Sequence, residues 1–233
     1  MPSSRTALVA GGTGLVGSLC VEWLLADAAY TSVITLVRRP PIFSPPKLDP
    51  QVVDFDRIPE MPPRAVDHVF CALGTTIKKA GSHEAFRKVD YEYPLRLAAW
   101  SVRAGASQFC VVSSVGADAK SSNFYLRVKG EMEDAISALP FQSVHIFRPS
   151  ILMGSRAEKR LGEAVGIRVG RMFQFAMLGS LRRYRPIAAM TVAAGMVAAA
   201  TKAVAGKHIY EHDEIIRMAK DYTVNRTSAA EVA

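Results

Sequence analysis

The 233-residue sequence predicts a single α/β domain in which helices cover both faces of a doubly wound parallel sheet. Short apolar segments alternate with longer segments of helical periodicity, and this alternation is typical of parallel sheets. The glycine-rich turn Gly11-x-x-Gly14-x-x-Gly17 lies between the first apolar segment and the first amphipathic one. Right-handed crossovers between such units place their strands in one sheet.

Taken in order, the apolar segments predict strands at Ala7–Ala10, Val33–Val37, Gln51–Phe55, His68–Ala72, Gln108–Ser113 and Ser143–Arg148. Helical periodicity predicts helices at Leu15–Leu25, His83–Ala104, Phe124–Leu139, Arg160–Leu178 and Thr191–Val204. The proline-rich stretch Pro40–Pro50 predicts a loop, because proline lacks the N–H group that a central strand needs.

The composition is that of an ordinary globular protein, with 49% hydrophobic and 21% charged residues. The formal net charge of +8 does not indicate nucleic-acid binding, because the basic residues are spread along the chain without a DNA- or RNA-binding motif. The densest basic cluster, Arg182-Arg183-Tyr184-Arg185, is interpreted as a solvated loop, with an anionic substrate or partner as the alternative.

Cysteine usage and hydropathy together favour a cytoplasmic protein. Cys20, Cys71 and Cys110 fall in apolar segments without metal-ligand spacing, so we expect buried thiols and no metal site. The uncharged stretch Pro186–Thr201 is short for a membrane span. Met1–Arg5 leads directly into the first strand, which argues against a signal peptide.

The glycine turn predicts a dinucleotide site. Glycine permits a tight turn and lets the backbone approach a pyrophosphate with no Cβ in the way. The N–H groups at the start of the following helix then face the phosphates, aided by the helix dipole. The spacing is a variant of the Gly-x-Gly-x-x-Gly form, and the alternative is a turn that only reverses the chain.

The ends of the expected strands carry the other candidate residues, because ligands of such sheets lie beyond the carboxyl ends of the strands. Arg38 and Arg39 follow the second strand, and no Asp or Glu occurs between Ser32 and Pro40. Arginine accommodates the 2′-phosphate of NADP, whereas an acid would bind the ribose hydroxyl of NAD. The sequence therefore predicts NADP(H) over NAD(H), with a solvated basic turn as the alternative.

Tyr125 and Lys129 form the candidate acid/base pair. They are one helical turn apart, so both side chains occupy one helix face, and no other tyrosine of the chain has lysine four residues on. A phenol has an ordinary pKa near 10, and a nearby ammonium makes it a better acid near neutral pH. The alternative is a surface Tyr–Lys pair without a chemical role.

Taken together, these residues resemble the short-chain dehydrogenase/reductase superfamily, in its atypical branch, and especially the Tat-interacting-protein-like oxidoreductases. The segments that carry the resemblance are Gly11–Gly17, Val52–Phe55, Cys71–Thr76, Ser113–Asp118, Ser121–Phe124, Val128–Glu131 and Phe147–Pro149. The resemblance extends to about Leu152 and is less distinctive afterwards. It implies a Rossmann-type fold, bound NADP(H), a catalytic tyrosine and a lysine that also holds the nicotinamide ribose.

The resemblance also assigns roles along the chain. Ser114 matches the position that hydrogen-bonds the substrate carbonyl, with Ser113 as a plausible substitute; a strand-ending turn is the alternative. Asp54 and Phe55 are expected to contact adenine, although Phe55 could equally belong to the core. The expected cofactor-binding residues are Gly11, Thr13, Gly14, Leu15, Val16, Gly17, Arg38, Arg39, Asp54, Phe55, Leu73, Gly74, Thr75, Thr76, Tyr125, Lys129 and Pro149.

One position departs from the superfamily's common pattern. Extended members often have asparagine where this chain has Asp90, and that asparagine supports a water-linked proton relay to the lysine. An aspartate can accept the same hydrogen bonds, but it adds a negative charge.

These observations favour an NADP(H)-dependent oxidoreductase that transfers a hydride to or from a small carbonyl or alcohol. The alternative is an NADP(H)-binding redox sensor that acts through protein partners, and a nucleotide-sugar epimerase is less favoured because the C-terminal portion is short. One domain is expected over residues 1–233, with 151–220 on the substrate side and 221–233 as a flexible tail.

Overall fold

A seven-stranded parallel sheet forms the centre of the computed structural model, which describes residues 4–42, 44–154, 179–202 and 204–231. Its strand order is β3-β2-β1-β4-β5-β6-β9, and a separate pair joins β7 to β8. The strands are β1 (Arg5–Ala10), β2 (Tyr30–Val37), β3 (Leu48–Val52), β4 (His68–Cys71), β5 (Gln108–Val112), β6 (Ser143–Phe147), β7 (Leu152–Met153), β8 (Ile187–Ala188) and β9 (Gly206–Tyr210).

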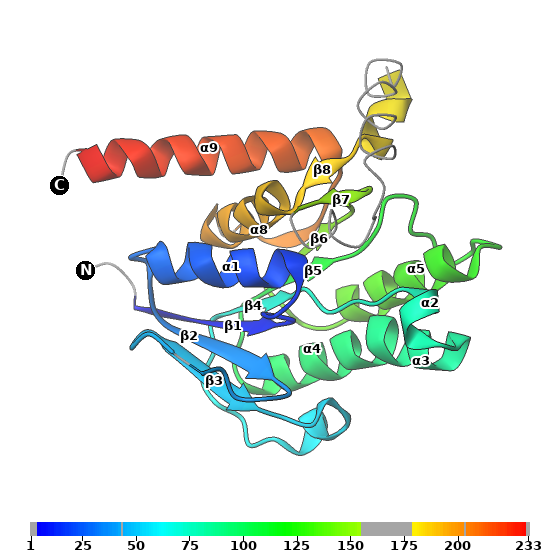
Figure 1. Ribbon diagram of the computed structural model, residues 1–233, viewed down its shortest axis with the longest axis horizontal. Helices are drawn as coiled ribbons and strands as arrows, with labels where there is room; N and C mark the ends of the chain where they lie inside the picture. The colour runs from blue at the N-terminus through cyan, green and yellow to red at the C-terminus, as the bar shows by residue number, and fades with distance from the viewer. Residues whose placement is uncertain (1–3, 43, 155–178, 203, 232–233) are drawn as a thin grey trace.

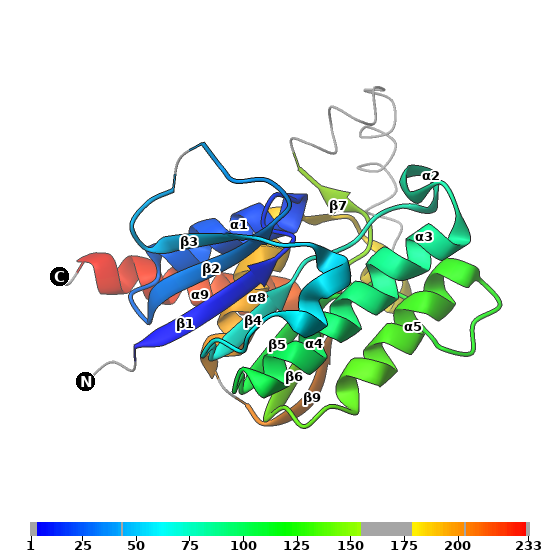
Figure 2. The same cartoon turned by 90° about the horizontal axis from the view of Figure 1, so that it is seen from below.

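Helices cover both faces of this sheet (Figures 1 and 2), and the predicted Rossmann-type α/β fold is confirmed. One face carries α1 (Leu15–Ala26), α8 (Ala189–Lys202) and α9 (His212–Glu231). The other carries α3 (His83–Arg87), α4 (Tyr93–Arg103) and α5 (Phe124–Ser137). The described residues also form short helical segments: η1 (Phe55–Glu60), α2 (Ile77–Ala80), the π-helical η2 (Lys88–Glu92) and η3 (Gly179–Tyr184).

Each face of the sheet has its own apolar core, because strands alternate their side chains between the two faces. Val9, Phe70 and Phe147 pack toward α1 and α8, whereas Leu8 and Val69 pack toward α4 and α5. The strands β4 and β6 are buried along their whole length, and their sequences are mostly apolar, with His68, Ser143 and His145 as the polar exceptions.

The chain reverses its winding direction at β1, which pairs with β2 on one side and with β4 on the other. The loops that follow β1 and β4 therefore lie side by side at the carboxyl edge of the sheet. They touch at Gly11, where an added Cβ would lie 2.5 Å from the carbonyl oxygen of Ala72. In open α/β sheets, ligands bind at this kind of switch point.

The boundaries of several predicted elements change in the structure. The strand predicted at Gln51–Phe55 ends at Val52, because the Asp54 side chain accepts a hydrogen bond from the Asp56 N–H and starts η1. The loop predicted to reach Pro50 ends earlier, at the start of β3. β3 is an edge strand, where proline is tolerated.

The C-terminal part holds elements that the sequence analysis did not predict, including β9 and α9. The segment 221–233 was expected to be a flexible tail, but α9 continues through it to Glu231. Ile215, Met218 and Ala219 are buried at helical spacing, and Tyr222 packs edge-on against Trp23 of α1. The helix predicted at Arg160–Leu178 lies outside the described residues.

A chain of hydrogen bonds crosses the sheet beneath α1 and α8. The Tyr30 hydroxyl bonds His68 Nδ1 at 2.8 Å, and His68 Nε2 lies 3.3 Å from the amide nitrogen of Gln108. The Gln108 amide oxygen accepts from His145 Nε2 at 3.1 Å, and His145 Nδ1 lies 3.0 Å from the Tyr210 hydroxyl. Every polar atom of this buried chain has a partner, which makes its burial tolerable.

Candidate active site

The glycine turn has the geometry of a backbone cradle. Gly11 has φ +84°, and the Gly14 N–H donates to the Gly11 carbonyl at 2.8 Å. A Cβ at Gly17 would lie 2.2 Å from that same carbonyl, so the helix could not approach the turn with a larger residue. Gly14 caps α1 without any side-chain hydrogen bond, and the first turn contains no acidic residue. The first-turn N–H groups of α1 therefore have no cap from the Gly14 side, which suits a phosphate.

The loop after β4 forms the second wall at the switch point. Residues Leu73–Thr76 run from the end of β4 into α2, which Thr76 caps by accepting a hydrogen bond from the Lys79 N–H. The Thr75 N–H donates to Asp90 Oδ2 at 2.9 Å, so this loop is tied to η2. A Cβ at Gly74 would lie 3.4 Å from Asp90 Oδ1, which leaves little space for a larger residue.

Arg38 and Arg39 stand directly after β2 and are both exposed. Among the described residues, no ion pair or hydrogen bond occupies either guanidinium. Asp54 and Phe55, after β3, each have a structural role: Asp54 caps η1, and Phe55 packs in the core with its ring centroid 5.6 Å from that of Tyr93. Their expected contacts with adenine stay a prediction.

Tyr125 and Lys129 lie on α5, whose N-terminus Asn123 caps by accepting a hydrogen bond from the Leu126 N–H. The Tyr125 ring packs against Phe86 of α3, with centroids 5.4 Å apart, and is partly exposed. Lys129 is turned inward and buried, and its ammonium lies 3.5 Å from the carbonyl oxygen of Val112 at the end of β5. The predicted pair thus stands at the carboxyl edge of the sheet, beside the loops after β4 and β5.

A buried carboxylate holds the lysine. Asp90 Oδ1 lies 2.8 Å from Lys129 Nζ, and the two side chains are only 1% and 4% exposed. Burial alone lowers the pKa of the Lys129 ammonium, but the attraction and hydrogen bond of Asp90 outweigh it, so the pKa lies above its usual value. Asp90 thus takes up the hydrogen bonds expected of an acceptor at this position, and it adds a direct ion pair.

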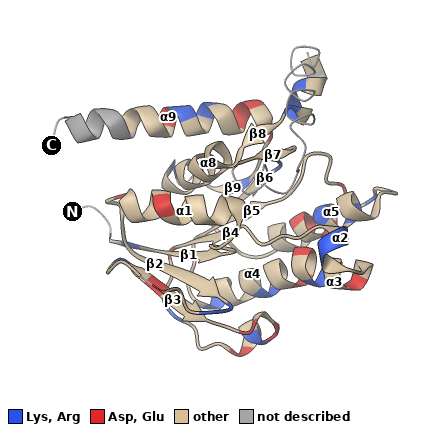
Figure 3. Ribbon diagram, in the orientation of Figure 1, with Lys and Arg blue, Asp and Glu red and all other residues tan. Residues whose placement is uncertain are grey.

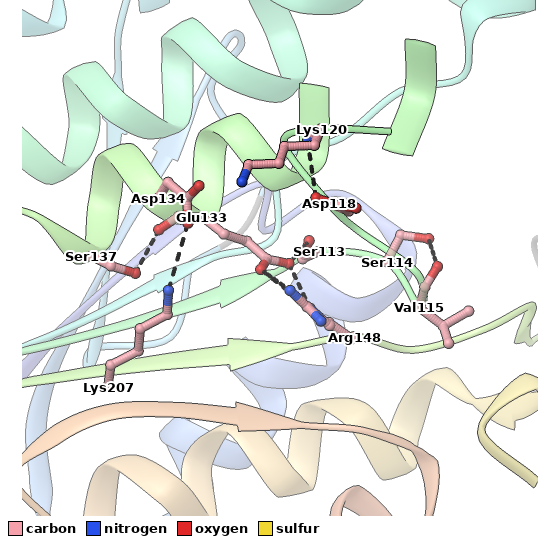
Figure 4. A network of polar contacts seen from close by, with 10 residues as sticks. All are labelled: Ser113, Ser114, Val115, Asp118, Lys120, Glu133, Asp134, Ser137, Arg148 and Lys207. Carbon is pink, nitrogen blue, oxygen red and sulfur yellow. Dashed lines mark hydrogen bonds and ion pairs between the residues drawn. The ribbon is translucent and has the colours of Figure 1, made fainter. Parts of the chain in front are cut away.

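The two serines after β5 have different partners (Figure 4). The Ser113 hydroxyl donates to Glu133 Oε1 at 2.5 Å, and Glu133 also pairs with Arg148, whose terminal nitrogen lies 2.5 Å from Oε2. Within the described residues, the Ser114 hydroxyl makes only a long contact of 3.4 Å with the carbonyl of Val115. Of the two, Ser114 is therefore the one whose hydroxyl can turn to a substrate.

The loop that carries Ser114 is fixed from two sides. The Val115 N–H donates to the Pro149 carbonyl at 3.0 Å, which joins this loop to the end of β6. On the other side the loop lies against α5 at Gly130, where an added Cβ would be 2.1 Å from the Ala119 nitrogen. Sequence analysis missed Gly130 and Glu133; the available signals were a glycine inside a helix and an acid one turn beyond Lys129.

Away from this site, the Arg182–Arg185 cluster belongs to η3 and the residues just after it. Arg182 lies 3.4 Å from Asp213, and Arg183 lies over the Tyr184 ring. Lysines and arginines elsewhere occur on both helical layers, interspersed with acids (Figure 3). In the described part of the chain, no group of three or more His, Cys, Asp or Glu side chains is arranged to hold a metal ion. Within those same residues, no helix is both long and apolar enough to cross a bilayer.

Comparison with known proteins agrees with this geometry. The model of the NAD dependent epimerase/dehydratase family matches residues 7–214. Protein HTATIP2 from Rattus norvegicus is 34% identical over 165 residues, covering 69% of this chain and 68% of the relative. The Candida albicans protein named FMP52, mitochondrial, is 32% identical over 209 residues, covering 87% and 90%. That name does not support the expected cytoplasmic location.

Solved structures share the fold at low identity. UDP-N-acetylglucosamine 4-epimerase from Bacillus cereus superposes with a TM-score of 0.64 at 18% identity, over 92% of this chain and 84% of that one. The dTDP-glucose 4,6-dehydratase DesIV from Streptomyces venezuelae gives 0.63 at 19% identity, over 88% and 74%. The predicted resemblance is confirmed: the chain belongs to the NAD dependent epimerase/dehydratase family, as an NAD(P)-binding protein of the atypical short-chain dehydrogenase/reductase type.

Proposed function

We propose that this protein is an NADP(H)-dependent oxidoreductase that interconverts a small carbonyl compound and its alcohol. The observation that carries the proposal is the position of Tyr125 and Lys129 on one face of α5, with Lys129 buried at the switch-point edge of the sheet. Members of this family are typically enzymes. A proton donor at that edge suits a reaction in which a dinucleotide lies across the ends of β1 and β4.

The residues at the edge of the sheet fit the dinucleotide. The backbone N–H groups of Gly11–Gly17 would hold the pyrophosphate, since Gly11 and Gly17 let the turn and the helix pack with no room for a Cβ at either position. Arg38 and Arg39 would bind the 2′-phosphate of NADP through fork-like, charge-assisted hydrogen bonds. Leu73–Thr76 and Pro149 would line the ribose and the nicotinamide, which supplies or accepts the hydride when the cofactor is bound.

The protein's own residues have two tasks in the reaction: they position the carbonyl oxygen of the substrate and transfer one proton to it. The Ser114 hydroxyl donates a hydrogen bond to the carbonyl oxygen and holds it near α5. As the carbonyl carbon gains a hydride, the Tyr125 phenol gives its proton to that oxygen, so a carbonyl becomes an alcohol. The Lys129 ammonium stabilises the resulting phenolate, and in alcohol oxidation the same steps run in reverse.

The test is NADPH consumption across a panel of aldehydes, ketones and quinones. On a substrate found in this way, the turnover of the Tyr125→Phe protein should be lower by roughly 10²-fold or more, because the substitution removes the transferable proton and keeps the packing of the ring. NADPH affinity should be retained in that variant. Activity that survives Tyr125→Phe would refute the mechanism, and wild-type inactivity on the whole panel would favour the second candidate.

The second candidate is a redox-sensing protein that binds NADP(H) and acts through protein partners. The observation in its favour is the Lys129–Asp90 ion pair, which engages the lysine within the fold. A sensor needs no proton donor, so Tyr125→Phe should leave its cofactor and partner binding unchanged. Two-hybrid or pull-down partners whose binding changes between NADP⁺ and NADPH would support it.

Domain organisation and location belong to the same proposal. We infer one domain over residues 1–233, with 151–220 on the substrate side, because the β7–β8 pair and η3 follow the carboxyl end of β6. A chain cut at residue 221 should lose stability, since Tyr222 packs edge-on against Trp23 and bonds Asp27 through its hydroxyl; unfolding by denaturant measures that loss. The cytoplasmic location stays a prediction that cell fractionation tests.

A further inference from the structure

The proposed mechanism leaves one feature unexplained, the buried carboxylate of Asp90. Asp90 lies in the π-helical segment η2, between α3 and α4, and it is almost fully shielded from solvent. A buried charge is expensive unless it is paired and hydrogen-bonded. Asp90 has both kinds of partner, the Lys129 ammonium at 2.8 Å and the Thr75 N–H at 2.9 Å.

The two partners of Asp90 belong to the two halves of the proposed site. Thr75 is in the loop after β4 that is expected to line the cofactor, and Lys129 supports the proton donor Tyr125. π-helical turns inside α-helices occur frequently at functional sites. Here the turn directs a carboxylate inward at the point where these two halves meet.

The pair also changes the electrostatics that Tyr125 experiences. An isolated ammonium one turn away stabilises a phenolate, but a carboxylate bonded to that ammonium cancels part of its field. We propose that Asp90 is a positioning residue that fixes the Lys129 ammonium and tempers its effect on Tyr125, so that the ion pair rather than the lysine alone sets the pH range of proton transfer. This inference rests on the proposed oxidoreductase function.

Other titratable groups near this pair do not supply the same control. Burial raises the pKa of the Cys71 thiol to about 11, so that it is neutral at physiological pH. His83 is exposed and stacks on Phe124. Three other charged side chains of α3 and η2 form ion pairs within the fold: Arg87 with Glu131, Lys88 with Asp56, and Glu92 with Arg96. Glu84 of α3 is exposed to solvent.

The test is a titration of Tyr125 that needs no substrate. Phenolate absorbance is recorded from neutral to alkaline pH, and the same curve for a Tyr125→Phe protein is subtracted, which isolates this tyrosine from the other six of the chain's seven. In the Asp90→Asn protein the titration curve of Tyr125 should lie at lower pH than in the wild type, by about one unit or more. The amide keeps the size of the side chain but removes the charge, so the ammonium takes the phenolate as its counter-ion.

A matched control removes a carboxylate from the solvent side of α5, the helix that carries Tyr125. Asp134→Asn on α5 should leave the Tyr125 curve unchanged, because Asp134 is 69% exposed and its field is screened by water. An unchanged curve in a folded Asp90→Asn protein would overturn the inference and reduce Asp90 to a structural role.

A second variant keeps the test decisive if Asp90→Asn does not fold. Lys129→Met combined with Asp90→Asn removes both charges at once, and the Tyr125 curve should then move by less than about one unit from that of the wild type, because the carboxylate already offsets much of the field of the ammonium. Replacing both members of a buried ion pair is often tolerated, unlike removing one. A larger movement to higher pH in the double variant would show that Asp90 does not offset the field of Lys129, and it would also overturn the inference. The proposed function fails separately, by absent NADPH turnover in the wild type.

Discussion

Acidification should destabilise this fold through His68 and His145, the two buried histidines of the chain that crosses the sheet. Gln108 presents an amide nitrogen to His68 Nε2, and that nitrogen can only donate. His68 must therefore accept there, and a proton on Nε2 would break the contact. Burial gives a second reason for neutrality, because it disfavours the charged form of both rings.

The magnitude follows from the pKa values. Desolvation by burial lowers the pKa of His68 and of His145 from 6.5 to about 4. Between pH 6.5 and pH 4 each histidine is mostly protonated in the unfolded chain and mostly neutral in the folded one. The free energy of unfolding is therefore highest above pH 6.5 and decreases as the pH falls toward 4. At about pH 5 the loss is roughly 2 kcal/mol for each histidine. Domains of ordinary stability have only about 5–15 kcal/mol in total.

Denaturant unfolding followed by circular dichroism, at about pH 7 and about pH 5, measures this loss. The wild type should lose roughly 4 kcal/mol more on acidification than a His68→Gln/His145→Gln protein, whose amides do not titrate. His83→Gln is the matched control, because His83 is exposed and its removal should leave the pH dependence unchanged. Equal losses in the wild type and the double variant would refute the argument from burial.

Three further predictions concern the cofactor and the lysine. NADPH should bind at least tenfold more tightly than NADH, about 1.4 kcal/mol, and calorimetry should find that preference lost in an Arg38→Ala/Arg39→Ala protein. Gly14→Val should abolish NADPH binding in a folded protein, because even a Cβ at this position lies 3.1 Å from the Gly11 carbonyl; near-normal affinity would place the cofactor elsewhere. Lys129→Ala should lower turnover and weaken NADPH binding together, as measured by KM and Kd on a substrate from the panel.

The elements around the cofactor cradle were predictable because their rules are local. A strand, a glycine turn and a helix follow one another within the first 26 residues, and the structure has β1 and α1 there. Buried strands such as β4 and β6 are short and mostly apolar, so their positions were predicted to within a residue or two. The edge strand β9 was missed because it is mostly exposed and carries Lys207 and His208, which give it no apolar signal.

The polar interior of the site could not be predicted, because its partners are set by register between distant segments. Glu133 lies one turn beyond Lys129 on α5, but only the pairing of β5 with β6 brings Ser113 and Arg148 to it. Asp90 reaches Lys129 from the π-helical turn η2. The direction of its side chain could not be predicted, because the count of 3.6 residues per turn applies to α-helices and not to a π-helical segment.

Gly130 shows how the structure explains a residue that local propensity disfavours. A glycine inside a helix costs about 1 kcal/mol relative to alanine, and α5 places it immediately after Lys129. Any Cβ there would collide with the backbone of Asp118 and Ala119, in the loop that begins with Ser114. The helix that carries Tyr125 and the loop that carries Ser114 can meet this closely only through glycine. Gly130 therefore has low helix propensity but permits the close packing of α5 on the loop after β5, and the proposed reaction uses residues of both elements.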